Sequence, residues 1–181
     1  SFMKFAIFSK ILTACAVLFL AGCVSSQIDP EFNRSEALKA RINLALAYLE
    51  QQDYPKAKEN IDKAITHDSH DYLPYSVLAY YYQQTGDVAN SQKAYQKALK
   101  LSQNRPDVLN NYGTFLCKQG QFQQAYSQFE QALQSKHAYY HQADTLENII
   151  LCAKSEPNSQ KFNEAFAQLA KLDKIRADKL R

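Results

Sequence analysis

A self-similarity with a period of 34 residues runs through the middle of this 181-residue chain. Ala64, Ala98 and Ala132 follow one another at this spacing, and a large side chain comes three residues before each of them. A further small residue comes four positions before each large one. A large-small pair lies further upstream in each unit and is called here its opening pair. The large residues are Ile61, Tyr95 and Phe129, the further small ones are Ala57, Ser91 and Ala125, and the opening pairs are Leu44-Ala45, Leu78-Ala79 and Tyr112-Gly113. A repeat of this length is typical of helical hairpins that stack on one another.

The spacing resembles that of tetratricopeptide repeats. Small residues suit the crossing of the two helices in a hairpin, because larger side chains there would hold the backbones apart. The sequence therefore predicts an all-α protein, and the resemblance implies a right-handed superhelix of about four α-α hairpins. The expected units are 38–71, 72–105, 106–139 and a degenerate 140–176, within a domain over 36–181. An ordinary helical bundle with accidental periodicity is the alternative, and three coincident units disfavour it.

Capping residues mark where helices should begin. Ser35 and Asp87 precede apolar-periodic segments and suit the N-cap position. In the fourth unit we expect a first helix over about 140–154 and an enlarged loop over 155–160. The last helix then presents an apolar stripe backed by polar residues, which is typical of the cap of a solenoid. The stripe consists of Phe162, Ala165, Phe166, Leu169 and Leu172.

The first 22 residues have the composition of a secretory signal. Lys4 and Lys10 come first, and a short apolar stretch over 11–21 follows, too short for a spanning helix of about 20 residues. Leu20-Ala21-Gly22-Cys23 resembles a bacterial lipobox. The resemblance implies cleavage before Cys23 and lipidation of that cysteine, with several acyl chains giving a stable anchor. The alternative is a signal peptide that contains an incidental cysteine.

The residues after Cys23 bear on location and partners. Val24 stands where Asp would retain an enterobacterial lipoprotein in the inner membrane, so the resemblance implies the periplasmic face of the outer membrane. The lipidated Cys23 and the tether occupy residues 23–35, and the twelve residues 24–35 reach about 40 Å at most. Loss of Lys4 and Lys10 from 21 basic residues leaves 19 against 18 acidic ones. This near-neutral body gives no electrostatic argument for nucleic acid.

Two cysteines remain after Cys15 leaves with the signal and Cys23 is lipidated. Cys117 and Cys152 lie late on the first helices of adjacent units, which are neighbours in such a stack. An oxidising periplasm favours a disulfide between them. The bond needs α-carbons within about 7 Å, whereas helix axes usually lie about 8–10 Å apart. Two buried free thiols are the alternative.

Titratable residues form no catalytic pattern in the sequence. His67 and His70 flank a turn, His137 and His141 are similarly isolated, and neither pair has further evident ligands, so we expect solvated histidines and no metal. There is no glycine-rich phosphate loop, nucleophile elbow or paired-acid motif. We therefore expect a protein that is not an enzyme and needs no cofactor.

In tetratricopeptide arrays the concave wall comes mainly from first helices, at positions 2, 5, 9 and 12 of each unit. In this chain those positions hold Lys39, Ile42, Leu46 and Leu49, then Leu73, Ser76, Tyr80 and Gln83, then Asp107, Asn110, Thr114 and Cys117. The groove should start apolar and become polar, which suits an amphipathic or extended peptide. Our candidate groove residues are Ile42, Leu46, Leu49, Leu73, Ser76, Tyr80, Asn110 and Thr114. The alternative is that the three from the first unit pack beneath the tether, on Ile28 and Phe32.

The lipobox, the tether and the repeats together resemble the type IV pilus biogenesis lipoproteins of the PilF/PilW family. The stretch from Asn110 to Cys117 is especially similar to that family's third repeat. The resemblance implies a monomeric scaffold that helps a secretin reach the outer membrane and multimerise, or that stabilises pili. It also implies secretin or other pilus-assembly components as partners. A general periplasmic adaptor for outer-membrane protein assembly or peptidoglycan enzymes is the alternative.

Overall fold

The structure, a computed structural model, describes residues 33–181. The predicted signal segment 1–22, the lipid-bearing Cys23 and the tether up to residue 32 lie outside the described residues. Within 33–181 there are nine helices and no strand, and none of these helices has the length and apolar character to cross a bilayer. Their bounds are α2 Glu36–Glu50, α3 Tyr54–His67, α4 Tyr72–Thr85, α5 Val88–Ser102, α6 Pro106–Lys118, α7 Phe122–Leu133, α8 Gln142–Ser155, α9 Ser159–Leu172 and α10 Lys174–Asp178.

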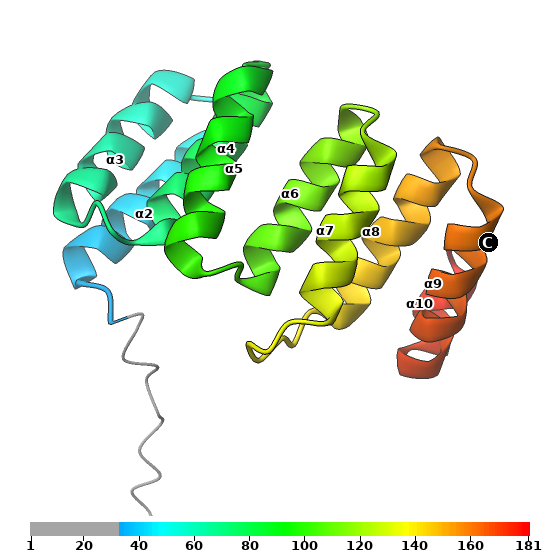
Figure 1. Cartoon of the computed structure of the whole chain (residues 1–181). Helices are drawn as coiled ribbons and strands as arrows, with labels where there is room; N and C mark the ends of the chain where they lie inside the picture. Colours follow the sequence, from blue (N-terminus) through cyan, green and yellow to red (C-terminus); the bar gives the residue numbers. More distant parts are fainter. Residues whose placement is uncertain (1–32) are drawn as a thin grey trace, which may run out of the picture. The chain divides into compact units, whose positions relative to one another are not determined.

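The helices pair as successive antiparallel hairpins (Figure 1). The pairs α2–α3, α4–α5, α6–α7 and α8–α9 each pack along their length, and the second helix of each pair packs on the first helix of the next. The short α10 packs back on α9. The prediction of an all-α stack of helical hairpins is therefore confirmed for the part of the chain that the structure describes.

Short polar side chains cap the starts of α2 and α5. The Ser35 hydroxyl accepts a hydrogen bond from the Leu38 backbone N–H at 3.1 Å, and the Asp87 carboxylate accepts one from the Asn90 N–H at 3.2 Å. Both caps agree with the sequence prediction, and each is worth about 1 kcal/mol. Gly86 ends α4 in the left-handed region at φ 81°, where L side chains are strained.

The predicted small residues lie where helices of a hairpin cross. In the second hairpin, the Ser91 hydroxyl donates to the backbone oxygen of Ala79 on the other helix at 2.8 Å, which requires close backbones. In the third hairpin, a Cβ added to Gly113 would come within 2.6 Å of the Phe129 ring. The little-and-large pattern thus reflects the direct approach of paired helices.

The buried apolar side chains form two clusters that meet at the second hairpin. The first cluster spans α2, α3 and the start of α4, and the second runs from α4 to α10. The side chain of Leu78 packs against both. No hairpin buries its apolar face alone, so the hairpins stabilise one another as repeats do.

The fourth unit differs from the prediction in its connections. The long connection is 134–141, before α8, and the link between α8 and α9 is only 156–158. The prediction of an enlarged loop over 155–160 is wrong because the Asn158 side chain caps the Lys161 N–H and starts α9 at Ser159. Asp173 likewise caps α10 by accepting from the Arg176 N–H, so a separate helix begins before residue 176 and runs past it.

Candidate functional site

A groove of about 470 Å³ lies along the first helices of the hairpins. Six of the eight residues predicted for a concave groove line it: Leu46, Leu73, Ser76, Tyr80, Asn110 and Thr114. Leu46 on α2, Tyr80 on α4 and Thr114 on α6 occupy the same position of successive 34-residue units. The repeat therefore lines up equivalent side chains from separate hairpins along one surface.

Ile42 and Leu49 do not line this groove, and their prediction as groove residues is corrected. They are 5% and 3% exposed and belong to the first apolar cluster. On α2 they share one stripe with Leu38 and Ala45, which faces α3 and Val77 of α4. Since a helix presents residues three and four apart on one face, large apolar side chains at these two positions are drawn into the core.

Further residues line the groove that the sequence prediction did not include: Val77, Tyr95, Asn111, Lys118 and Asn148. Gln83 also lines it, as the position pattern suggested. Asn148 is 34 residues after Thr114, so an extension of the register by one unit would have found it. Tyr95 comes from α5, a second helix, and no first-helix pattern could have indicated it.

The groove changes character along its length. Leu46, Leu73 and Val77 make one part apolar, and Leu46 and Tyr80 remain 44% and 43% exposed. Amides and hydroxyls line the part built by α6 and α8. Lys118 is the one charged residue among the lining side chains within 33–181. An elongated cleft with apolar and uncharged polar walls suits a peptide segment better than a charged metabolite.

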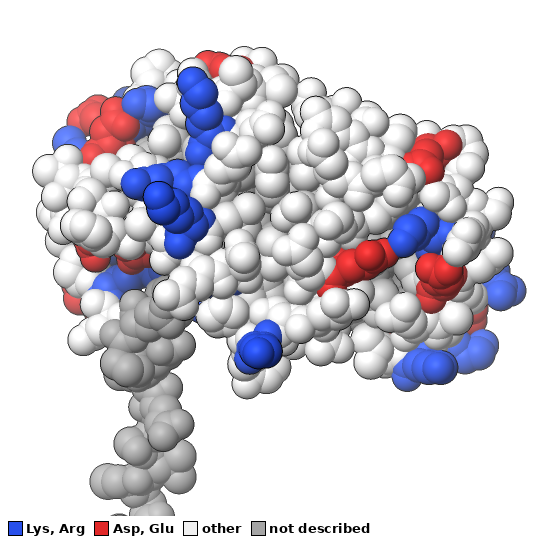
Figure 2. Space-filling model, viewed as in Figure 1, with Lys and Arg blue, Asp and Glu red and all other residues white. Residues whose placement is uncertain are grey.

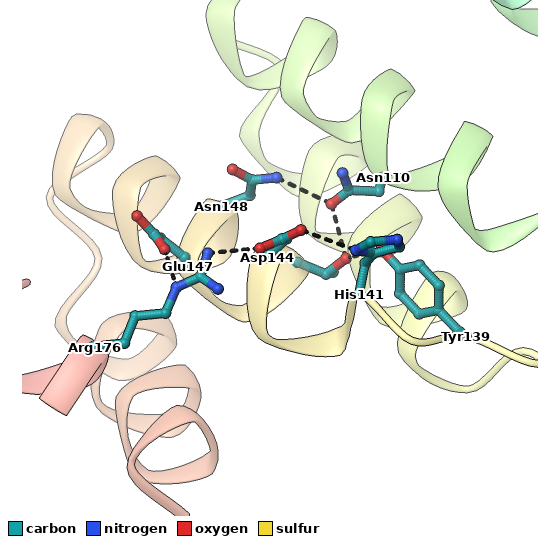
Figure 3. A network of polar contacts seen from close by, with 8 residues as sticks. Asn110, Tyr139, His141, Asp144, Glu147, Asn148 and Arg176 are labelled. Atoms are coloured by element: carbon teal, nitrogen blue, oxygen red, sulfur yellow. Dashed lines mark hydrogen bonds and ion pairs between the residues drawn. The ribbon is translucent and has the colours of Figure 1, made fainter. Parts of the chain in front are cut away.

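A network of polar contacts ties α6, α8 and α10 together (Figure 3). The Asn110 side-chain oxygen accepts from the Thr145 hydroxyl at 2.8 Å and from the Asn148 amide at 3.0 Å. At the other side of α8, the Arg176 guanidinium donates to Asp144 at 2.7 Å and to Glu147. The hydrogen bonds to these two carboxylates raise the pKa of Arg176 above its ordinary value. The wall of the groove on α8 is thus fixed from both sides.

Cys117 and Cys152 are joined by a disulfide in the structure, with α-carbons 5.9 Å apart. The bond links α6 directly to α8, where the two helices approach each other. It fixes the fourth unit to the regular array beside the groove.

The four histidines do not meet. His67 ends α3 and His70 lies on the connection after it, and both are exposed. The His137 ring nitrogen lies 3.3 Å from the Gln103 backbone oxygen, and His141 pairs with Asp144 at 3.3 Å. Within residues 33–181, no three His, Cys, Asp or Glu side chains gather as metal ligands do. On the face drawn in Figure 2, basic and acidic groups are scattered and the area over α6 and α7 carries few of either.

Protein-family models match two stretches of the chain. Residues 38–70 match the family described as tetratricopeptide repeat. Residues 74–138 match the family described as YpiA-like, C-terminal tetratricopeptide repeats. Together the matches span the first three predicted units.

Two relatives are similar over most of the chain. A Haemophilus influenzae protein described as uncharacterized is 46% identical over 171 residues, which cover 94% of this chain and 95% of that protein. The type IV pilus assembly protein PilF of Pseudomonas aeruginosa is 29% identical over 159 residues, which cover 86% of this chain and 63% of PilF. The chain therefore spans less than two thirds of the length of PilF.

Solved structures share the fold. The structure of Pseudomonas aeruginosa PilF superposes with a TM-score of 0.70 at 29% identity, and covers 77% of this chain and 62% of that one. The structure of PilW, described as a widely conserved type IV pilus biogenesis factor, superposes with a TM-score of 0.68 at 22% identity and covers 77% of this chain and 63% of that one. The fold of this chain is that of tetratricopeptide-repeat superhelices.

Proposed function

The chain belongs to the same family as the Haemophilus influenzae protein and is built of tetratricopeptide repeats, and we propose that it is a protein-binding scaffold in type IV pilus biogenesis. In this role it assists a secretin to reach the outer membrane and multimerise, or stabilises pili. Two lines of argument support the proposal, one from the groove and one from sequence similarity.

The groove carries the binding part of the proposal. Its exposed Leu46 and Tyr80 offer apolar contact area, and its amides and hydroxyls can pair with a peptide main chain. Such a surface can hold an extended or amphipathic segment of a partner.

Similarity to PilF carries the pilus part of the proposal. It extends over 86% of this chain, well beyond a single repeat. A match of that extent supports a shared architecture rather than a chance likeness between repeats. PilF is described as a type IV pilus assembly protein, which supports a pilus-assembly component as the partner, and we propose a secretin as the first candidate.

The proposed location is the periplasmic face of the outer membrane. The lipobox that ends in Cys23 supports an acyl anchor, and the tether after it would keep the repeats within about 40 Å of the lipid surface. A scaffold held there meets outer-membrane components as they arrive.

The test is a gene deletion complemented with groove variants. Leu46→Asp combined with Tyr80→Asp places two carboxylates on the apolar part of the groove without touching the buried core. We expect loss of secretin multimers and of surface pili in this strain, with normal levels of the folded scaffold. Leu44→Asp is the matched control, because Leu44 lies on the same helix, is 42% exposed and does not line the groove.

Two results would contradict the proposal. The first is full piliation and normal secretin multimers in the deletion strain. The second is a pull-down from detergent-solubilised membranes in which outer-membrane assembly factors or peptidoglycan enzymes dominate and the secretin is absent. That outcome would favour the general periplasmic adaptor.

A further inference from the structure

Two amide side chains of the groove, those of Asn110 and Gln83, have their oxygen atoms occupied from inside the protein. Asn110 shows this most clearly. Its side-chain oxygen already accepts two hydrogen bonds, from the Thr145 hydroxyl and the Asn148 amide. Among residues 33–181 its amide nitrogen has no partner and is not buried. Asn110 therefore offers the groove N–H groups only.

Thr145 holds that orientation. Its side chain is fully buried, and its single hydroxyl proton goes to Asn110. The Tyr139 hydroxyl bonds to the same Thr145 oxygen and must be the donor there. In this arrangement the Asn110 oxygen faces the Thr145 hydroxyl and the Asn148 amide, and the Asn110 N–H groups are left for the groove.

Gln83 repeats the arrangement on the neighbouring hairpin. The buried Tyr95 hydroxyl donates to the Gln83 side-chain oxygen at 2.8 Å. The Tyr95 phenol is protonated at physiological pH, and its burial raises its pKa further above that range. Gln83 is thus also oriented with its N–H groups available to the groove.

Two further groove residues, Tyr80 and Lys118, also offer donors. The Tyr80 oxygen accepts from the Gln84 amide at 2.6 Å, which leaves its proton for a ligand. Lys118 contributes an ammonium, and no Asp or Glu is among the lining residues of the described chain. At these positions the groove therefore offers donors to a ligand whose own polar groups accept.

We propose that the groove recognises carbonyl oxygens of an extended main chain through the fixed N–H groups of Asn110 and Gln83, with Thr145 and Tyr95 as their positioning residues. This inference rests on the proposed peptide-binding function and adds its chemistry. Side chains of the bound segment would then meet the apolar part at Leu46 and Leu73. Main-chain recognition of this kind selects for an extended conformation more than for a particular sequence.

The test compares Thr145→Val with Thr145→Ser in the full mature chain in detergent micelles. The probes are 12-residue synthetic peptides that tile the secretin of the same bacterium, measured by fluorescence anisotropy. We expect Thr145→Val to weaken the tightest peptide about five- to tenfold, the worth of one hydrogen bond, and Thr145→Ser to bind normally. Asn110→Asp should lose at least about tenfold, because a carboxylate would face a carbonyl. Gln123→Glu, an exposed change on α7, is the charge control and should bind normally.

Replacement of single peptide amides by esters weakens the carbonyl acceptor, and we expect one or two positions to lose affinity in wild type but not in Asn110→Asp. If Thr145→Val and Asn110→Asp bind the peptide as tightly as the wild type does, the inference is overturned and peptide capture still stands.

If no secretin peptide binds the wild-type protein, the secretin proposal fails separately. The inference is then decided by NMR with the blocked dipeptide N-acetylglycine N′-methylamide. The dipeptide should shift the side-chain amide signals of Asn110 and Gln83 in the wild-type protein. In Thr145→Val it should leave the Asn110 signal unmoved. Wild-type signals that do not move would overturn the inference.

Discussion

At the scale of single residues, Gly113 shows why the repeat needs small side chains. It lies on α6 where α7 crosses, and the buried Phe129 ring occupies the space that a Cβ would take. Its counterparts Ala45 and Ala79 are fully buried at the same position of the first two units. The third hairpin therefore packs more closely at this position than an alanine permits.

Gly113→Ala should therefore destabilise the protein. The clash of the added Cβ with the Phe129 ring destabilises the folded state, whereas alanine favours the helix by about 1 kcal/mol over glycine. We expect the free energy of unfolding to fall by about 1–2 kcal/mol in total. Thermal unfolding followed by circular dichroism should show a melting temperature lower by about 2–4 °C for each kcal/mol. Gln123→Ala, an exposed change on α7, should stay within about 0.5 kcal/mol of wild type. An unchanged or raised melting temperature in Gly113→Ala would contradict the close crossing.

Residue positions were predictable from the sequence where the 34-residue register alone decides them. Leu46, Tyr80 and Thr114 share one register position and all line the groove. Ile42 and Leu49 follow the same rule but are buried, because large apolar side chains in the first hairpin pack against α3 and α4. The orientation of Asn110 depends on Thr145 and Asn148 from the next unit, and no pattern within one repeat contains that information.

At the scale of helices, the attachment of α8 to α6 sets the fourth unit. The Cys117–Cys152 disulfide, the Asn110 hydrogen bonds and the clamp of Arg176 on Asp144 and Glu147 all act on α8. These contacts replace the regular repeat pattern that the fourth unit lacks. The groove wall on α8 depends on them.

We expect the disulfide to be present in protein from the periplasm. The two cysteines are 35 residues apart, so the bond restricts the unfolded chain. Its reduction should lower the free energy of unfolding by about 2–4 kcal/mol, because the unfolded chain gains conformational entropy. Denaturant unfolding with and without reductant measures this. A Cys117→Ala/Cys152→Ala variant is the control and should not respond to reductant. Two free thiols in the non-reduced protein, counted by mass spectrometry, would contradict the expectation.

Helices were more predictable than their connections. Apolar periodicity and caps such as Ser35 and Asp87 act locally, so the sequence indicates them directly. The prediction of an enlarged loop in the fourth unit is wrong because the Asn158 side chain caps the Lys161 N–H, so α9 begins at Ser159. Asp173 accepts a hydrogen bond from the Arg176 N–H and so starts α10 as a separate helix after α9. The sequence prediction does not include this cap, because it follows the apolar stripe alone.

At the scale of the whole molecule, the proposal joins a stack of hairpins to a lipid anchor. The stack supplies an extended groove that no single hairpin could form. The anchor, which depends on Cys23, would confine that groove to the membrane surface. Function in this account needs both, because an unanchored scaffold would be diluted through the periplasm.

Cys23→Ser should separate these two contributions. We expect the variant to lose metabolic labelling with palmitate and to move from the outer-membrane fraction to another fraction, since a single residue carries all the acyl chains. Secretin multimers should fall while the stability of the repeats is unchanged. Continued labelling and outer-membrane fractionation of the variant would contradict lipidation at this residue.

The most direct measurement of the central claim is photo-crosslinking in living cells from inside the groove. A benzophenone amino acid replaces Tyr80, which is half-exposed in the groove, and in a second strain it replaces Lys63, which is exposed on α3 and does not line the groove. After irradiation, the account predicts a crosslinked product from position 80 that mass spectrometry identifies as the secretin or another pilus-assembly component, and none from position 63. The absence of such a product from position 80, or equal capture from both positions, would contradict it.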